Sequence, residues 1–333
     1  MELIVLVVIF VPCLCIGADV ELTTSSSSVN EGESLTLTCS VSVDGVVDAT
    51  FFEDGGKYLG YVKLVDGRCE DARNNTCKQQ CSCSGDGRTF FWTISNLDRS
   101  MDGRGFICGV NSTKAIYSSV RRIRVLYPPT GSVILSPSGT YTNVTGTTVA
   151  LDCQVKGGNP LATLSWECKG SPRTGHSWTN SGIARSRLQL TIDESYHRRQ
   201  CVCTAKHQGS VFHEGAVEFN VIYPPTRSVV LSPSGTYTSI TGTTVTLDCR
   251  VEGGNPLATL SLECKGTPMT GQNGTNAGVT RSRLELTIDE SYHRRQCVCT
   301  ATHQASPNGV YGTESVEFNV ICKYDIFFLH NLC

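Results

Sequence analysis

Short stretches of alternating hydrophobic and polar residues run along the chain, and they predict β-strands. Near the N-terminus, Leu35, Leu37 and Cys39 recur at a period of two, which places them on one face of an extended strand. The same period returns at 149–155, 188–192 and 217–221, with Gly, Asn, Pro and Thr between the stretches. No segment keeps a helical period. The pattern therefore predicts an all-β fold of antiparallel sandwiches.

A long internal repeat occupies the second half of the chain. Residues 127–208 align without gaps on 223–304, and 64 of the 82 positions are identical. Such a repeat indicates a modular array. Eight of the 18 differences fall within 171–184, which we expect to be exposed loop or sheet edge. One scaffold carrying a varied surface explains this cluster, and so does relaxed drift in a loop.

Each copy of the repeat has two cysteines 50 residues apart and a large apolar residue 13 positions after the first. The apolar residue is Trp166 in the first copy and Leu262 in the second. This spacing resembles the immunoglobulin sandwich, in which two cysteines join the sheets and a tryptophan packs against the bridge. The resemblance implies the bridges Cys153–Cys203 and Cys249–Cys299. It also implies a smaller core around Leu262.

A second cysteine pair accompanies the first in each copy. Cys168 follows Trp166 by two residues and Cys201 precedes Cys203 by two, so all four side chains should face inward. A Cys168–Cys201 bridge between neighbouring strands is one pairing, and exchange to Cys153–Cys201 is the other. The Cys-Thr-Ala ending makes Cys203 the better match for the sheet-joining position. The same reasoning applies to Cys264 and Cys297 in the second copy.

Residues 19–126 form a first domain with a different pattern. Cys39 and Cys108 lie 69 residues apart, and Phe106 stands two positions before Cys108. This ending resembles that of a variable-type immunoglobulin domain, with phenylalanine in the place of tyrosine. The resemblance implies a Cys39–Cys108 bridge and room for additional strands. We expect one of the phenylalanines at 51 and 52 to fill the core position that a tryptophan takes elsewhere.

A cluster of four cysteines lies between those two strands, at Cys69, Cys77, Cys81 and Cys83. The chain has 18 cysteines, which is typical of proteins from an oxidising compartment. We therefore interpret the cluster as two loop disulfides rather than as a zinc site. Four cysteines allow three different sets of disulfide pairings. The shared parity of Cys81 and Cys83 disfavours a bond between these two.

The chain ends give expectations about processing. Residues 1–17 resemble a secretory signal peptide, although the absence of Lys and Arg also fits a retained anchor. Two Tyr-Pro-Pro-Thr segments begin the second and third domains, 127–222 and 223–321, and 322–333 form an irregular tail. Its apolar run is shorter than a membrane span. We expect a secreted, extracellular chain, attached to a membrane only if a longer form carries an anchor. Cys322 and Cys333 either bridge each other or join two chains.

Several motifs invite a catalytic or ligand-binding reading. Residues 193–197 place an acid, a hydroxyl and an imidazole side by side, and they recur at 289–293. Adjacent residues of a turning chain point in different directions, so we interpret the motif as a strand corner rather than a catalytic triad. His207 and His303 have no acidic or cysteine neighbours, which argues against metal. Residues 121–124, rich in arginine, fit a strand with a charged outer face better than a heparin site. We expect no enzyme activity, cofactor or metal.

Net charge and glycosylation sequons give expectations about the surface of the protein. The net charge of −2 disfavours nucleic acid or an anionic membrane as partner. Asn-x-Ser/Thr sequons predict glycans at Asn74, Asn111, Asn143 and Asn273.

The whole layout resembles tandem immunoglobulin proteins, including nectin-like adhesion molecules, CD22-like receptors and invertebrate recognition proteins. It implies a non-enzymatic recognition or adhesion protein for a cell-surface protein or glycan, with homophilic contact as one form. A soluble humoral recognition protein for microbial surfaces is the alternative. A CD22-like sialic-acid site is not carried over, because Cys108-Gly109 departs from the arginine it requires.

We expect binding to concentrate on the first domain. It carries unique sequence, a long segment between its sheet cysteines and the four-cysteine loop, whereas the other domains repeat each other. The candidate contacts are Lys57, Tyr58, Tyr61 and Arg68, chosen because aromatic and arginine side chains favour interfaces.

Overall fold

The computed structural model describes residues 19–73 and 75–321, which form two compact units. The first unit runs to Thr130 and includes Gly157–Ala162, and the second holds Gly131–Lys156 and the chain from Thr163. The all-β prediction is confirmed, since strands and short 3-10 turns (η) are the regular elements of the described residues. The predicted signal peptide, Asn74 and the tail with its two cysteines lie outside the described residues.

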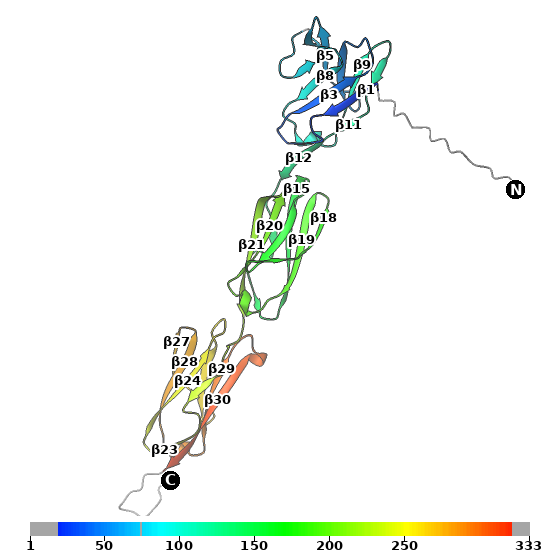
Figure 1. Cartoon of the computed structure of the whole chain (residues 1–333). Helices are drawn as coiled ribbons and strands as arrows, with labels where there is room; N and C mark the ends of the chain where they lie inside the picture. The colour runs from blue at the N-terminus through cyan, green and yellow to red at the C-terminus, as the bar shows by residue number, and fades with distance from the viewer. Residues whose placement is uncertain (1–18, 74, 322–333) are drawn as a thin grey trace, which may run out of the picture. The chain divides into compact units, whose positions relative to one another are not determined.

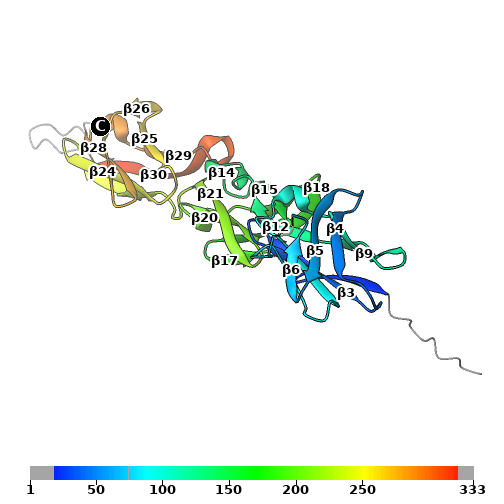
Figure 2. The same cartoon turned by 90° about the horizontal axis from the view of Figure 1, so that it is seen from above.

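Two sheets packed face to face form most of the first unit, and we call them the N-terminal sandwich. One sheet has the order β1 (Val20–Thr24), β3 (Leu35–Val41), β8 (Thr89–Ile94) and β7 (Cys81–Cys83) (Figure 1). The other has the order β10 (Ala115–Tyr117), β9 (Gly105–Asn111), β4 (Asp48–Glu53), β5 (Tyr58–Val65) and β6 (Arg68–Asp71) (Figure 2). The short elements are β2 (Ser28–Asn30), η1 (Arg99–Met101), β11 (Arg121–Arg122) and β12 (Arg124–Pro129).

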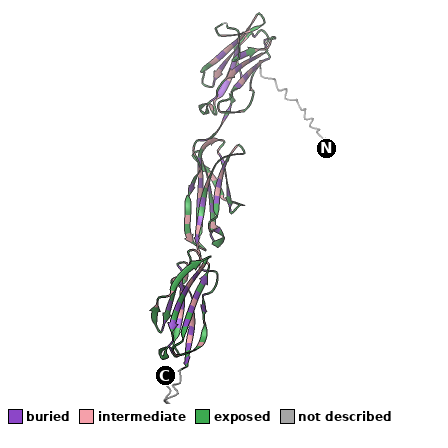
Figure 3. Cartoon of the chain, turned by 90° about the vertical axis from the view of Figure 1, so that its left-hand side faces the viewer, coloured by how far each residue is buried: buried purple, intermediate pink, exposed green. Residues whose placement is uncertain are grey.

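Alternate residues of the two sheets fill the core of the N-terminal sandwich, as the buried and exposed bands along the strands show (Figure 3). Phe51 is fully buried and Phe52 is only partly buried, because successive side chains of a strand point to opposite faces. Trp92 of β8 stacks on Phe51 with ring centroids 6.3 Å apart. It also packs against Gly60, where an added Cβ would lie 2.3 Å from the indole. The tryptophan of this core therefore comes from β8, not β4.

The second unit contains two further pairs of sheets, the middle and C-terminal sandwiches, each with its own buried core. The middle strands are β13 (Ile134–Ser136), β14 (Gly139–Val144), β15 (Thr148–Asn159), β16 (Thr163–Cys168), β17 (Ser171–Arg173), β18 (His176–Asn180), β19 (Ile183–Thr191), β20 (Gln200–His207) and β21 (Ser210–Ile222), with η2 (Glu194–Tyr196). One sheet contains β18, β19, β15 and β13, and the other has the order β14-β21-β20-β16-β17.

The C-terminal sandwich repeats this topology, as its sequence predicts. Its strands are β22 (Val230–Ser232), β23 (Gly235–Ile240), β24 (Thr244–Glu252), β25 (Thr259–Cys264), β26 (Thr267–Met269), β27 (Gln272–Asn276), β28 (Val279–Thr287), β29 (Gln296–Thr302) and β30 (Val310–Ile321), with η3 (Glu290–Tyr292) and η4 (Pro307–Gly309). The orders are β22-β24-β28-β27 and β23-β30-β29-β25-β26.

Disulfides of three kinds join these elements. The bridges between the two sheets of a sandwich are Cys39–Cys108, Cys153–Cys203 and Cys249–Cys299. The bridges between neighbouring strands of one sheet are Cys168–Cys201 and Cys264–Cys297, each with Cα atoms 4.1 Å apart. In the four-cysteine cluster, Cys69 pairs with Cys83 and Cys77 with Cys81. Cys69–Cys83 connects β6 to β7, so it ties the edges of the two N-terminal sheets together.

Candidate recognition face on the N-terminal sandwich

Aromatic side chains gather on the outer face of the sheet that contains β4 and β5. Phe52 on β4 contacts Tyr58 on β5 and Tyr117 on β10, with ring centroids 6.3 and 6.4 Å away. Tyr58 is 52% exposed and Tyr117 is 61% exposed. Contiguous exposed apolar surface commonly marks an interaction site. We call Phe52, Tyr58 and Tyr117 the aromatic face.

Local irregularities of the backbone position these rings. Phe51 lies opposite Gly60, but the pairing shifts after Phe51, so that Phe52 lies opposite Tyr58 instead of Leu59. The shift brings the two aromatic rings to the same face. On β9, an added Cβ at Gly109 would lie 2.6 Å from the Tyr117 ring. The absence of a side chain at Gly109 therefore allows Tyr117 to lie against the sheet.

Charged side chains border the aromatic face at the β4–β5 turn. Glu53 accepts hydrogen bonds from Lys57 Nζ and Arg104 Nη1, both at 2.9 Å. The hydrogen bond from Lys57 is the main cause that holds the pKa of Glu53 below its usual range, against the opposing effect of burial. Next to this group, Arg122 Nη2 lies 2.7 Å from Asp54 Oδ2. The turn is thus fixed by ion pairs while the Lys57 side chain stays exposed.

Tyr61 and Arg68 have different surroundings from Lys57 and Tyr58. The Tyr61 hydroxyl donates a 3.0 Å hydrogen bond to Asp48 Oδ2. Burial, followed by this bond, raises the pKa of Tyr61 to about 12. Arg68 lies opposite Val65, at the other end of β5 from Tyr58. At about 3.3 Å per residue the separation along the strand is roughly 23 Å. The structure therefore places Lys57 and Tyr58 together, and it separates Arg68 from them.

Two members of the aromatic face were missed from the sequence. Phe52 could have been found by parity, since an inward Phe51 forces its neighbour outward. Tyr117 gave no signal, because it lies on a three-residue strand with no visible period. Only the pairing of β10 with β9 places Tyr117 near Phe52.

The acid–hydroxyl–imidazole motif forms a strand corner. Asp193 caps η2 by accepting from the Ser195 backbone N–H at 2.9 Å, and the Ser195 hydroxyl bonds to Asp193 and to Lys169 Nζ. His197 instead lies with its Nδ1 3.3 Å from Asn255 Nδ2. The hydroxyl therefore has no imidazole base beside it. Across 19–73 and 75–321, no group of three or more His, Cys, Asp or Glu could hold a metal ion.

The sequons differ in how their asparagines are placed. Asn111 is exposed at the end of β9, and Asn273 is exposed on β27. Asn143 is half-buried, and its Nδ2 donates to the Tyr141 hydroxyl at 3.0 Å. Since a glycan replaces one of the two hydrogens on Nδ2, glycosylation of Asn143 would leave a single N–H for this bond.

Parts of this chain are similar in sequence to several known proteins. Human nephrin is 30% identical over 166 residues, which are 47% of this chain and 13% of nephrin. Mouse hemicentin-2 is 26% identical over 216 residues, or 64% of this chain and 4% of hemicentin-2. A CD166 antigen homologue from Carassius auratus is 27% identical over 197 residues, covering 54% of this chain and 35% of the relative. No family model matches the chain.

The fold also matches solved immunoglobulin tandems. A chain in the crystal structure of Dpr2 Ig1–Ig2 in complex with DIP-Theta Ig1–Ig3 superposes with a TM-score of 0.51 and 15% identity. The match covers 90% of this chain and all of that one. This chain is a tandem-domain member of the immunoglobulin superfamily.

The chain covers only a small part of the length of these relatives. The chain spans only 13% of human nephrin and 4% of mouse hemicentin-2. Over the stretches that the structure describes, no helix combines the length and the hydrophobicity that crossing a membrane requires.

Proposed function

We propose that this immunoglobulin-superfamily chain is an extracellular recognition or adhesion protein that binds a cell-surface protein through its first domain. The aromatic face carries the proposal. The rings of Tyr58 and Tyr117 are exposed, and both are held in place by contact with Phe52. Tyrosine is enriched among the residues that dominate binding energies, since its ring is large and loses little conformational freedom on binding.

The charged border complements this face. Lys57 and Arg122 are exposed, and they form ion pairs with Glu53 and Asp54 at the β4–β5 turn. Rim charges of this kind steer association and select among partners more than they add affinity. A partner with an acidic rim around an apolar centre would fit this arrangement.

The comparison and the disulfides support the extracellular setting. The superposed chain comes from a complex between two immunoglobulin proteins, Dpr2 and DIP-Theta. At 15% identity the two chains share a fold. The comparison therefore suggests the class of partner, an immunoglobulin protein, but not which residues would contact it. The seven disulfides of the described residues are typical of a protein from an oxidising compartment, which supports an extracellular setting. A second copy of this chain is one candidate partner.

Binding of the full chain to cells, to itself and to microbial polysaccharides tests the proposal. Tyr58→Ser and Tyr117→Ser should each weaken binding to a cell-surface protein by about tenfold or more, because a central aromatic contact is worth roughly 2 kcal/mol. Arg68→Ser is the matched control on the same sheet and should change binding little.

Two outcomes would redirect the assignment. A chain lacking 19–126 that keeps full binding would place the ligand site outside the first domain. Binding to microbial polysaccharides without binding to cells would favour the humoral alternative.

A further inference from the structure

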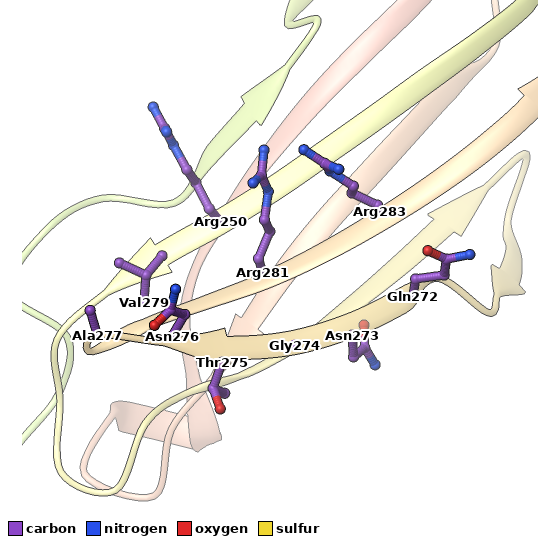
Figure 4. A pocket seen from close by; sticks show the side chains of 10 residues that line it. All are labelled: Arg250, Gln272, Asn273, Gly274, Thr275, Asn276, Ala277, Val279, Arg281 and Arg283. Atoms are coloured by element: carbon purple, nitrogen blue, oxygen red, sulfur yellow. The ribbon is translucent and has the colours of Figure 1, made fainter.

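A cavity of about 610 Å³ opens on the outer face of the C-terminal sandwich, over β24, β28 and β27. Figure 4 shows Arg250, Arg281 and Arg283 rising on one side of this sheet. Asn273 and Thr275 point to the other side of β27, so a glycan on Asn273 would leave the sheet away from the arginines. We call this cavity the arginine groove. It lies in a different sandwich from the aromatic face.

The three arginines differ in how closely they are paired with a carboxylate. Arg281 is held by a two-point contact with Asp248, and Arg283 approaches the same carboxylate only to 3.8 Å. Arg250 lies directly opposite Arg281 in the ladder and is exposed. Among the described residues Arg250 has no carboxylate within 4.0 Å. Like charges opposite each other in a sheet repel, so an incoming anion would relieve the Arg250–Arg281 pair.

The middle sandwich shows what closes such a groove. The residue aligned with Gly274 is Trp178, whose ring stacks on His176 with centroids 5.5 Å apart. The residue aligned with Arg250 is Gln154. The cavity in the corresponding place has a volume of about 240 Å³. The exchange of Trp178 for Gly274 removes a large side chain, and the exchange of Gln154 for Arg250 adds the third arginine of the larger cavity.

The differences between the repeats concentrate in this groove. Six of its ten lining residues differ from their middle counterparts, although 64 of 82 repeat positions are identical. The six are Arg250, Gln272, Asn273, Gly274, Ala277 and Val279. Five of the six lie in 267–280, the counterpart of the variable segment 171–184, whereas Arg250 lies on another strand and faces the same cavity.

We propose that the arginine groove binds a carboxylated sugar at the end of a glycan chain. Arginine binds a carboxylate through two parallel hydrogen bonds, and Arg250 is free to supply them. The amides of Gln272 and Asn276 line the same groove and can bind sugar hydroxyls. The volume lies within the range of small-ligand sites.

Carboxylates outside the groove favour one anionic sugar over a long polyanion. Glu252 follows Arg250 on β24 with the same parity, and its carboxylate lies 3.1 Å from Arg227 Nε. Glu285 follows Arg283 on β28 in the same way and is exposed. A polysaccharide with charges on every residue would meet these carboxylates beyond the arginines.

Saturation-transfer NMR on the full chain, freed of its N-glycans by enzyme, tests the groove. The probes are 3′-sialyllactose and a glucuronic-acid disaccharide, which distinguish two sources of the carboxylate, with lactose as the neutral control. We expect saturable binding of at least one carboxylated probe and none of lactose. Arg250→Gln should weaken that binding about tenfold, as loss of a charge-assisted hydrogen bond predicts.

Gly274→Trp should abolish the binding while every charge is retained. An added Cβ at Gly274 meets nothing within 4 Å and the middle sandwich carries tryptophan at this place, so the variant should fold. The control Arg124→Gln removes the same charge from an exposed site in the first unit and should leave binding unchanged. In an Arg250→Gln background, Gln154→Arg with Trp178→Gly should restore binding in the middle sandwich.

Each of four results would overturn the proposal. They are equal signals for lactose and the carboxylated probes, unchanged binding in both Arg250→Gln and Gly274→Trp, an equal loss in Arg124→Gln, and absence of binding to both carboxylated probes. None of these results bears on the aromatic face, which lies in the other unit.

Discussion

Trp166 and Leu262 occupy the same place in the two repeats, and each is almost wholly buried. The Trp166 indole also donates a 3.0 Å hydrogen bond to Ser186 Oγ. Leucine can fill only part of the indole volume and has no donor. The middle sandwich thus has a larger core contact and one more buried hydrogen bond at this point.

We expect the C-terminal sandwich to unfold at a lower temperature than the middle one. Trp166→Leu should destabilise the middle sandwich by about 2 kcal/mol and lower its transition by roughly 10 °C, towards that of its repeat. Calorimetry of the full chain measures both transitions. The exposed repeat difference Gln189→Glu is the control and should move neither. An unchanged middle transition in Trp166→Leu would refute the prediction.

Glu53 is a second residue whose surroundings predict a measurable effect. Its side chain is 11% exposed and bound to Lys57 and Arg104, and its pKa is lowered in the folded state. A carboxyl with a lowered folded pKa stabilises the fold above its unfolded pKa, about 4.3, and loses that contribution as the pH falls through the folded value.

Glu53→Gln should therefore destabilise the N-terminal sandwich by about 1–3 kcal/mol at pH 7, because two charge-assisted bonds weaken. At pH 2 the difference between the variant and the parent should be smaller than at pH 7, since the protonated fraction of Glu53 rises as the pH falls. Urea unfolding at both pH values measures this. Asp44→Asn is the matched control, because the Asp44 carboxylate pairs with Arg88 in full exposure. A loss that persists in acid would point to packing instead of charge.

At the scale of elements, paired strands carry the second bridge of each repeat. Cys168 lies directly opposite Cys201 in the β16–β20 ladder, so this bridge joins residues that the backbone hydrogen bonds already hold together. Cys153–Cys203 instead joins two sheets that meet only through side chains. The two bridges therefore constrain the unfolded chain to different extents.

Replacing Cys168 and Cys201 together by alanine should destabilise the middle sandwich by at most about 3 kcal/mol, and by less than loss of Cys153–Cys203. The sheet-joining bridge already closes most of the loop, so little chain entropy remains for the second. Denaturant unfolding of the two double variants gives the comparison. Peptide mapping without reduction checks the pairing itself. Free thiols at 168 and 201, or a Cys153–Cys168 link, would contradict it.

At the scale of the whole molecule, the Tyr-Pro-Pro-Thr linkers are held by one repeated asparagine. In the second unit, Asn255 Nδ2 donates to the Val221 carbonyl at 2.7 Å, and the Asn255 and Tyr223 backbones exchange hydrogen bonds. In the first unit, Asn159 Nδ2 donates to the Val125 carbonyl at 2.8 Å. The preceding Gly254 permits this approach, since a Cβ there would lie 3.1 Å from Pro225 N.

Asn255→Ala should expose the linker at 223–226 to protease. The loss of about 1 kcal/mol of hydrogen bonding should speed cleavage there roughly fivefold, since cleavage follows the population of the open form. Limited proteolysis of the full chain, with fragments identified by mass, measures the rate. Asn276→Ala, on the exposed strand β27, is the control. Equal cleavage in both variants would show that the asparagine does not hold the linker.

The sequence by itself determined the class of fold and the repetition of one sandwich topology. Alternation of period two decides which side chains are buried wherever one face of a sheet is covered, and the cysteine spacing fits that alternation. It also placed Cys168 and Cys201 on the inward face, because parity is a local property of the chain.

The tertiary structure decided which distant residues meet. The aromatic face depends on the shifted pairing after Phe51 and on the packing of Tyr117 against Gly109, neither of which has a local signal. The packing of Trp92 on the buried Phe51 in the N-terminal sandwich likewise had no signal in the sequence. The arginine groove likewise needs three strands side by side, so an exchange such as Trp178 for Gly274 acquires meaning only when its cross-strand neighbours are known.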